Sequence, residues 1–494
     1  MAEYLTPGIY IEEIDIGSKP IEGVSTSTAG FVGQAEKGPL DPRLITSFEQ
    51  FSRTYGGYIK DSYLAYAVDG FFRNGGSRCY IARVIGSGAK KAKVSINSKS
   101  EEIEVVANGP GLWGNNIKVA IEKGTLDGSL IKLTVYSGKS EKDTSPSVVE
   151  VFDNLSVDLS ASNYCMKMIN EISDYVTINH KGPKTPTAEP STGLQALTGG
   201  TEGDALAATD FSGSSNVPGE RTGLDAFNEI DDISIVCIPD EDKFPDVLHG
   251  DLVTHCERRK DRFAILQAAK SSKNVATLRP SETSKYAAYY YPWIKILDPL
   301  TGMPILIPPG GHVAGVYARV DQEKGVHKAP ANEAINGVMA LEFKITKGEQ
   351  DVLNPKGVNC IRAFPGRGIL IWGARTSSSD PAWKYVNVRR LFIFVEKSIE
   401  AGTQWAVFEP NDEKLWARVK QTISQFLTGV WRSGALMGAT QDEAFFVKCD
   451  RTTMTQSDID NGRLVVVVGI APVKPAEFVI FRIAQVAKGS EISE

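Results

Sequence analysis

The chain has 494 residues, of which 42% are apolar and 23% are charged, and its formal net charge is −6. The apolar content excludes wholesale disorder, and the length suits about three domains at roughly 150 residues each. The acidic balance argues against nucleic-acid binding, which normally needs a basic face. No apolar run approaches the roughly 20 residues of a membrane span, and no secretory signal is visible, so we expect synthesis in a cytoplasm without membrane insertion.

A short apolar run lies near the N-terminus, over residues 4–16, and contains Pro7-Gly8 close to its start. Breaker residues at 17, 18, 20 and 23 separate it from the next apolar stretch, 29–33. An extended arm ahead of a domain either folds back on its own sheet or adds a strand to a neighbour's sheet. The residues of this candidate arm are Pro7, Gly8, Ile9, Tyr10, Ile11, Glu12 and Ile14.

Two helices and a strand are expected after the arm. Ser47 can cap a helix that ends near Tyr55, and a second helix is expected over residues 62–73, with apolar side chains on one face. A strand at 79–84 completes a compact α/β piece. From residue 86 to 200 the pattern changes to short strand-competent runs between Gly, Ser, Asn and Pro clusters, which predicts a small inserted β-sandwich.

A second α/β stretch follows the insertion. Strands are expected at 233–239 and 263–267, with a helix between them that ends near residue 260. Strands that alternate with helices predict a mostly parallel sheet covered on both faces. Carboxylates at 231, 232 and 240–242 are expected in a solvated loop or at a helix start. Arg389-Arg390 could bind an anion, but an ion pair at the sheet margin is the simpler interpretation.

The clearest helix of the chain is expected at 411–430, where Asn411 or Asp412 can cap it and apolar residues share one face. Its opposite side is polar, either as a solvated face or as a docking face for an acidic partner. The polar side carries Lys414, Arg418, Gln421 and Gln425. Two β-rich runs follow, at 464–470 and 478–483. The second run is a candidate C-terminal strand and consists of Phe478, Val479, Ile480, Phe481, Arg482 and Ile483.

Catalytic and cofactor-binding signatures are mostly absent. The chain has no phosphate-binding loop, no dinucleotide fingerprint and no nucleophile elbow. His249, His255 and Cys256 form the one close grouping of metal-ligand types, and their spacing fits no usual zinc site. The six cysteines form no C-x-x-C pair and are expected as buried thiols. We therefore predict no catalytic residue, no metal and no cofactor.

Several blocks of sequence, in order along the chain, resemble the phage tail sheath family. They begin with Pro7–Glu13, Gly30–Gly33 and Phe71–Gly76, and continue with Gly109–Asn115. The most specific blocks come later. They are Tyr291-Pro292-Trp293, Pro308–Gly315, Ala329–Asn332, Trp372–Thr376, Val388-Arg389-Arg390 and Phe408–Asn411.

The resemblance implies a multidomain α/β fold with a subtilisin-like middle domain, an inserted β-sandwich and extended N- and C-terminal β arms. The implied parts are an N-terminal arm at 1–22, the first part of the α/β core at 23–88 and the inserted sandwich at 89–200. The subtilisin-like domain would follow at 201–365, and a C-terminal sheath domain at 366–494. The likeness to subtilisin is one of fold, so proteolysis is not predicted.

The resemblance also implies a function and partners. Subunits would form sixfold rings stacked helically around an inner tube protein, and N- and C-terminal arms would add strands to neighbouring subunits. Contraction would then drive the tube through a target envelope, with baseplate and terminator proteins, and possibly sheath paralogues, in the same particle. Lys414, Arg418 and Gln421 are the residues we expect to face the tube. The particle could be a phage tail or a cell-encoded injection device.

Two other interpretations stay open on the residues alone. One is an α/β hydrolase-like enzyme that uses the middle domain, for which His255 is the residue to test. The other is a structural protein that forms closed rings rather than contractile cylinders. Activity assays and electron microscopy separate the three.

Overall fold

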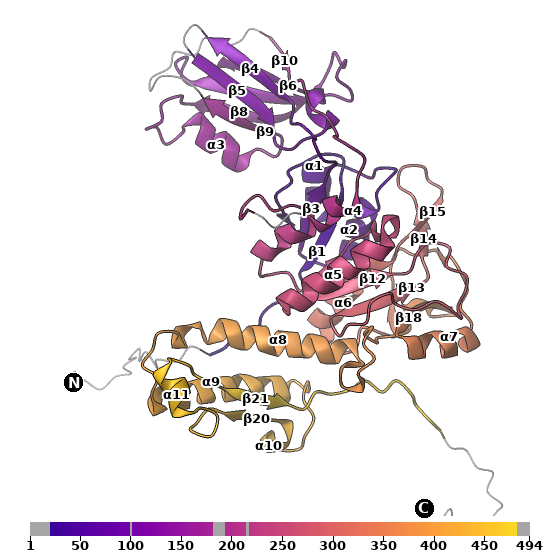
Figure 1. The fold of residues 1–494 in the computed structure, drawn as a ribbon. Helices are drawn as coiled ribbons and strands as arrows, with labels where there is room; N and C mark the ends of the chain where they lie inside the picture. Colours follow the sequence, from indigo (N-terminus) through magenta and orange to yellow (C-terminus); the bar gives the residue numbers. More distant parts are fainter. Residues whose placement is uncertain (1–19, 99–100, 181–192, 214–216, 482–494) are drawn as a thin grey trace, which may run out of the picture.

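The computed structural model describes residues 20–98, 101–180, 193–213 and 217–481. The candidate arm and the last two residues of the candidate C-terminal strand, Arg482 and Ile483, lie outside these ranges. Figure 1 shows three layers along the long axis: the insertion at one end, a large sheet with its helices in the middle, and the C-terminal helices at the other end. Within the described ranges, no helix has the length and apolarity needed to cross a membrane.

The middle layer is built on a nine-stranded sheet. Its six inner strands are parallel, and the outer strands on both sides are joined to the sheet by antiparallel pairing. The order is β16 (Glu333–Ala334), β19 (Gly368–Ile371), β18 (Val358–Phe364), β13 (Ala287–Tyr291), β12 (Phe263–Gln267), β11 (Ile235–Cys237), β1 (Ala29–Gln34), β3 (Cys79–Val84) and β2 (Arg43–Ile45). Every residue of β12 and β13 is buried, as expected for strands covered on both faces.

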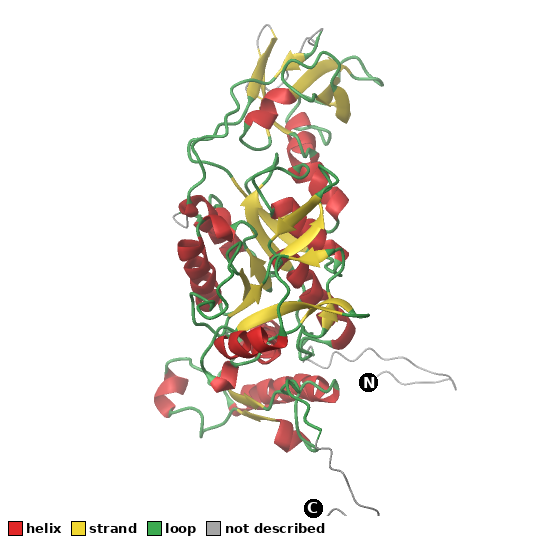
Figure 2. Cartoon of the chain, turned by 90° about the vertical axis from the view of Figure 1, so that its right-hand side faces the viewer, coloured by secondary structure: helices red, strands yellow, loops and turns green. Residues whose placement is uncertain are grey.

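Helices cover both faces of this sheet, as Figure 2 shows. Two of them, α2 (Leu64–Arg73) and α6 (Gly310–Lys324), pack closely against each other and against the central strands. Glycines allow this approach, because a Cβ on Gly311 would lie 2.3 Å from the carbonyl oxygen of Ala67. The helices α4 (Ala208–Ser212) and α5 (Pro245–Arg259) pack together with the turn Gly223–Glu229.

The remaining elements of the middle layer lie beside the sheet. The helix α1 (Phe48–Tyr55) is capped by Ser47, whose Oγ accepts from Gln50 N at 3.1 Å. A small sheet combines β15 (Pro304–Ile307), β14 (Ile294–Leu297) and β17 (Ala340–Leu341), and α7 (Lys347–Leu353) precedes β18.

The insertion consists of two antiparallel sheets around one apolar core. One sheet has the order β10-β6-β7-β8 and the other β4-β5-β9, with a single helix, α3, beside them. The elements are β4 (Lys93–Ser98), β5 (Glu101–Ala107), β6 (Ile117–Lys123), β7 (Ile131–Ser137), β8 (Ser147–Leu155), α3 (Cys165–Ile172), β9 (Val176–His180) and β10 (Gln195–Ala196). The core cluster of the insertion is separate from that of the middle layer.

The C-terminal layer combines two long helices with a two-stranded sheet. The elements are α8 (Val386–Gly402), α9 (Glu413–Arg432), α10 (Gln441–Ala444), β20 (Phe445–Lys448), α11 (Gln456–Asp460) and β21 (Val467–Ile470). The helix α8 contributes to two cores, because Ile393 packs in the middle layer whereas Leu391 and Val395 pack with α9. It therefore lies at the boundary between the two layers.

Two expectations from the sequence need correction. Asp240 and Glu241 are buried rather than solvated. Asp240 accepts hydrogen bonds of 2.7 Å from Ser62 Oγ and Tyr63 N, which replace the water that it loses. Arg389 and Arg390 lie in the helix α8 and not at a sheet margin, although Arg390 does form the expected ion pair, with Asp321.

Candidate assembly surfaces

The carboxyl ends of the parallel strands, where α/β sheets usually bind ligands, are filled by the protein itself. Glu241 accepts from Gln267 N, and Gly310 N donates to Gln267 Oε1 at 2.7 Å. A Cβ on Gly310 would lie 2.6 Å from both Cys237 Sγ and Gln267 Oε1. His249 lies nearby with Nδ1 2.9 Å from Ser281 Oγ and Nε2 3.4 Å from Glu241 Oε1. These contacts leave a packed edge rather than an open crevice.

His255, the residue considered for a hydrolase, lies near the other end of α5. It is buried, and its Nε2 is 3.3 Å from Nη1 of Arg262. Burial, followed by the charges of Arg262 and Arg258, lowers the pKa of His255 to about 3. A ring that gives up its proton at this pKa is a poor general base at neutral pH.

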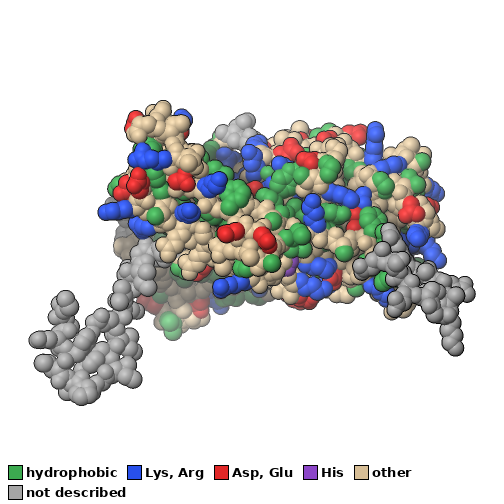
Figure 3. Space-filling model, turned by 90° about the horizontal axis from the view of Figure 1, so that it is seen from below, with side chains coloured by type: hydrophobic (Ala, Val, Ile, Leu, Met, Phe, Trp, Pro, Cys, Tyr) green, Lys and Arg blue, Asp and Glu red, His purple; other side chains and the backbone are tan. Residues whose placement is uncertain are grey.

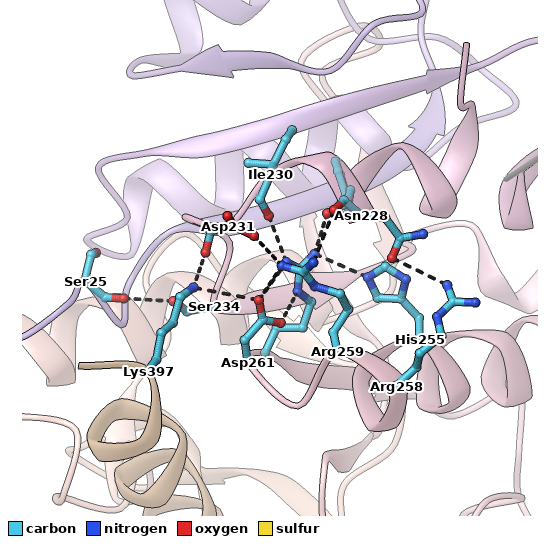
Figure 4. Close-up of polar contacts among 12 residues, drawn as sticks. Ser25, Asn228, Ile230, Asp231, Ser234, His255, Arg258, Arg259, Asp261 and Lys397 are labelled. Atoms are coloured by element: carbon cyan, nitrogen blue, oxygen red, sulfur yellow. Dashed lines mark hydrogen bonds and ion pairs between the residues drawn. The ribbon is translucent and has the colours of Figure 1, made fainter. Parts of the chain in front are cut away.

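Charged side chains around His255 join α8 to the amino ends of β11 and β12, as Figure 4 shows. Arg262 is buried and donates to the carbonyls of Phe227 and Ile230 and to Asp261. Lys397 of α8 donates to the carbonyl of Asp231 and lies 4.0 Å from Asp261 Oδ2. Burial lowers the pKa of Lys397. The network attaches the C-terminal layer to the sheet.

The helix α9 presents the polar side that the sequence predicts. Asp412 caps it by accepting from Leu415 N at 2.8 Å, which settles the choice between Asn411 and Asp412. Lys414, Arg418 and Gln421 are exposed, and Arg418 lies 4.6 Å above the ring of Trp405. Part of the Arg418 charge is thus directed to its own chain. Seen from the end of the molecule (Figure 3), Lys and Arg side chains are scattered among apolar ones and form no continuous basic patch.

The two-stranded sheet has room for further strands. The strands β20 and β21 pair only with each other among the residues that the structure describes. On the inner face, Phe445 and Val447 are buried in the core of the C-terminal layer. Outside it, Phe446 is 50% and Val467 is 42% exposed. A sheet this small is marginal by itself and offers edges to a partner strand.

The chain after β21 leaves the C-terminal layer and is fixed at Glu477. Arg375 binds this carboxylate with two hydrogen bonds, from Nε to Oε1 at 2.7 Å and from Nη2 to Oε2 at 2.8 Å. Asn354 Nδ2 donates at 2.8 Å and Tyr385 Oη at 3.0 Å, and Lys384 Nζ lies at 3.2 Å. Burial alone would raise the pKa of Glu477, but these hydrogen bonds outweigh it and lower the pKa to about 2.

The described part of the candidate C-terminal strand follows Glu477 and forms no strand pairing with the other described residues. Phe478 and Val479 are 69% and 70% exposed, and Ile480 and Phe481 are 81% and 82% exposed. No strand is assigned to these four residues. A run of four large apolar side chains in water is unfavourable, and such runs in soluble proteins mark interaction sites.

At the other end of the chain, the first described residues run along α8. Thr26 Oγ1 donates to Asp321 Oδ2 at 2.7 Å, and its carbonyl accepts from Arg390 Nη2 at 2.8 Å. Val24 N donates to Ser398 Oγ at 3.1 Å. These contacts fix the point from which the candidate arm begins.

The sequence did not predict either set of anchoring contacts. Each joins residues far apart in the chain, and Arg375 and Glu477 are 102 positions apart. The available signal was the presence of Arg375 and Arg390 in two of the blocks that resemble the sheath family. The structure brings Lys414, Arg418 and Gln421 to one exposed side of α9, as their spacing predicts. His249, His255 and Cys256 do not converge, and no metal-binding cluster exists among the described residues.

Two family models match the chain. The phage tail sheath protein central domain matches residues 204–377, and the phage tail sheath C-terminal domain matches residues 378–485. The two matched stretches adjoin at the segment that leads into α8.

Individual relatives carry the same description. The tail sheath protein of Burkholderia phage BcepMu is 21% identical over 464 residues, which cover 89% of each chain. The tail sheath protein of Vibrio phage KVP40 is 28% identical over 192 residues, which are 38% of this chain and only 28% of that protein. Among solved structures, the helical sheath of the anti-feeding prophage in its contracted state has a TM-score of 0.61 at 24% identity, over 98% of this chain and 99% of that one. This likeness establishes a shared fold.

Proposed function

The chain belongs to the phage tail sheath protein family, and on this premise we propose that it is the repeating subunit of a contractile sheath, linked to its neighbours by exchanged strands. Proteins of this family are structural and are not enzymes. The observation that carries the proposal is the exposed apolar run Phe478–Phe481 in a chain that also offers an incomplete two-stranded sheet.

Strand exchange would provide a partner both for the exposed apolar run and for the two-stranded sheet. The C-terminal run of one subunit adds to the β20–β21 sheet of another, and the arm at residues 7–14 adds in the same way. Covering four large apolar side chains stabilises the contact by roughly 6 kcal/mol at about 1.5 kcal/mol each, before the entropy of ordering the strand is subtracted. Backbone hydrogen bonds then fix the register of the added strand.

The geometry of such a contact favours a continuing assembly. An arm on one side of the subunit and an acceptor sheet on the other make a heterologous interface, which gives a ring when the rotation closes and a helix when it does not. We propose sixfold rings stacked helically, in which the strand links persist while the subunits rotate during contraction. Energy for the movement would come from better packing of the contracted state, because packed interfaces are bistable.

The exposed side of α9 is the proposed contact with an inner tube protein. Lys414 and Gln421 supply a cation and an amide, and Arg418 is partly engaged by Trp405. A few exposed polar contacts are weak, which suits a sheath that must release the tube. Baseplate and terminator proteins, and other sheath proteins in the same particle, complete the proposed partners.

Electron microscopy of the purified protein tests this function. We expect striated cylinders from the full chain and folded monomers from a chain that lacks residues 1–16. A matched control shortens 183–190, in the insertion, and should still form cylinders. Cylinders from the arm-deleted chain would overturn the strand-exchange proposal, and discrete closed rings from the full chain would favour the non-contractile alternative.

A further inference from the structure

We propose that α8 acts as a mechanical tie between the two arms, so that a pull on one arm passes along α8 to the other. Each arm is attached to the body of the subunit at a root. The N-terminal root is the segment Ile21–Thr26, and the C-terminal root is the segment Val473–Glu477. This inference rests on the proposed function, in which both arms hold neighbouring subunits. It concerns the path of force within one subunit, which the strand exchange itself does not define.

The N-terminal root lies along α8 from its C-terminal end. Ile21 is opposite Gly402, where a Cβ would come within 2.5 Å of Ile21 Cγ1. Gly23 packs against Phe394, and a Cβ on Gly23 would lie 2.8 Å from Cζ of Phe394. Ser398, which lies between Gly402 and Phe394 on α8, accepts from Val24 N. The segment therefore follows the helix surface in close contact over several residues.

A buried ion pair ends this contact. Arg390 binds Asp321 of α6 through Nη1 at 2.9 Å and Nη2 at 2.6 Å, and both side chains are nearly inaccessible to solvent. The same pair holds Thr26 through its hydroxyl and its carbonyl. Pulling the root away would take two hydrogen bonds from this buried charged pair, and buried polar groups that lose such partners are costly, so the root is not easily removed.

The C-terminal root is fixed at the opposite end of α8. Tyr385, the residue that precedes the helix, and Lys384 both contact Glu477. Asn387, in the first turn, donates to the carbonyl of Val473 at 3.2 Å. Arg375 adds two charge-assisted hydrogen bonds to Glu477, and such a paired contact fixes the orientation of the carboxylate.

The helix between the two roots is continuous. It runs for 17 residues, or about 25 Å at roughly 1.5 Å per residue, and its one glycine, Gly402, is its last residue. Figure 1 shows the described N-terminal segment running along α8, and the described C-terminal segment leaving past the end of α8 that follows Tyr385. Lys397 and Arg390 hold the middle of the helix to the sheet layer. An unbroken helix with an arm at each end is thus the direct route between the two linkages.

The anchors can be weakened without removing the arms. Glu477→Gln keeps the shape of the C-terminal anchor but removes its charge, and Thr26→Val combined with Ser398→Ala removes two hydrogen bonds from the N-terminal root. Lys474→Gln is the control, because Lys474 is exposed on the same segment. We expect each anchor variant to fold and assemble, and to give broken, short sheaths after contraction where the control gives long ones.

A measurement on the isolated subunit tests the anchor itself. All six cysteines are buried, so a cysteine placed at Phe478 can be labelled selectively with a spin probe. Glu477→Gln should increase the mobility of this probe, and Lys474→Gln should not. Equal mobility in both variants would overturn the anchor.

The two proposals fail in different ways. Cylinders built without the arms would overturn the strand-exchange function. If deletion of the arms blocks assembly while the anchor variants contract into sheaths as long as those of Lys474→Gln, the strand exchange stands and the tie is wrong. Fragmentation confined to the anchor variants supports both.

Discussion

The middle sheet and the C-terminal sheet of this chain differ in how far their edge strands are open to pairing with another chain. The middle sheet has nine strands, and its outermost strands, β2 and β16, have only three and two residues. The C-terminal sheet has two strands of four residues each, and apolar side chains of β20 and β21 are exposed. Short edge strands discourage pairing with other chains, whereas an incomplete sheet invites it.

Stability and assembly therefore depend on different layers of the subunit. Stability lies in the middle layer, whose central strands are wholly buried between helices. In the proposed function, assembly depends on the C-terminal layer, whose sheet has two strands among the described residues and can accept further strands from other subunits. Substitutions in the two sheets should therefore have separable effects.

The largest effect on stability is expected in the middle sheet. Ile265 is fully buried in β12, and Ile265→Ala removes methyl groups and leaves a cavity. We expect the free energy of unfolding to fall by about 2–5 kcal/mol, measured by denaturant titration of the monomer. A loss below about 0.5 kcal/mol would show that the sheet core is not where stability resides.

A substitution in the C-terminal sheet should impair assembly and leave the stability of the subunit nearly unchanged. Val467 lies opposite Lys448, so Val467→Glu creates a cross-strand pair of opposite charges and should leave unfolding within about 0.5 kcal/mol of the parent. Charge on an edge strand disfavours the addition of another strand, so cylinder formation should be lost. Sedimentation and denaturant titration measure the two outcomes. Normal cylinders from this variant would mean that this part of β21 does not accept a strand.

Acid should release the C-terminal root. The pKa of Glu477 is lowered to about 2, from an ordinary value of about 4.3, because hydrogen bonds from Arg375, Asn354 and Tyr385 outweigh the effect of burial. A lowered pKa means that the stabilisation is complete above pH 4.3 and is lost as the pH falls toward 2. A probe at position 478 should become mobile over this range. Glu477→Gln, already mobile, should show no such transition.

Much of the fold follows from the sequence because it depends on local pattern. The strand Phe263–Gln267 has the predicted bounds, and α9 differs from its prediction by two residues at each end. The helix α6 was not predicted, because Gly310, Gly311 and Gly315 are poor helix formers. Gly311 and Gly315 let α2 approach, so a tertiary contact outweighs local propensity there.

The candidate surfaces were predicted only in part. The exposed side of α9 follows from helical spacing, but the anchors at Thr26 and Glu477 join residues far apart in sequence, which local pattern does not reveal. Stacking of Arg418 on Trp405 was equally invisible. This contact changes how the tube-facing prediction should be tested.

The smallest effect on the subunit is expected at the tube-facing side of α9. Lys414→Glu is a cleaner test than a change at Arg418, whose replacement would also lose about 0.5–1 kcal/mol of cation–π attraction to Trp405. Lys414 is exposed, so unfolding should change by less than about 0.5 kcal/mol.

Assembly on the tube should respond to this charge and not to charge elsewhere on the helix. Lys420→Glu is the matched control, because Lys420 is exposed on α9 but lies about 120° around the helix axis from Lys414. We expect Lys414→Glu to form sheath without bound tube, counted in electron micrographs, while Lys420→Glu forms normal particles. Equal numbers of tube-filled particles from both variants would mean that another part of the C-terminal layer faces the tube. In that case the exposed side of α9 is simply solvated, and the sheet edges alone connect the layer to its partners.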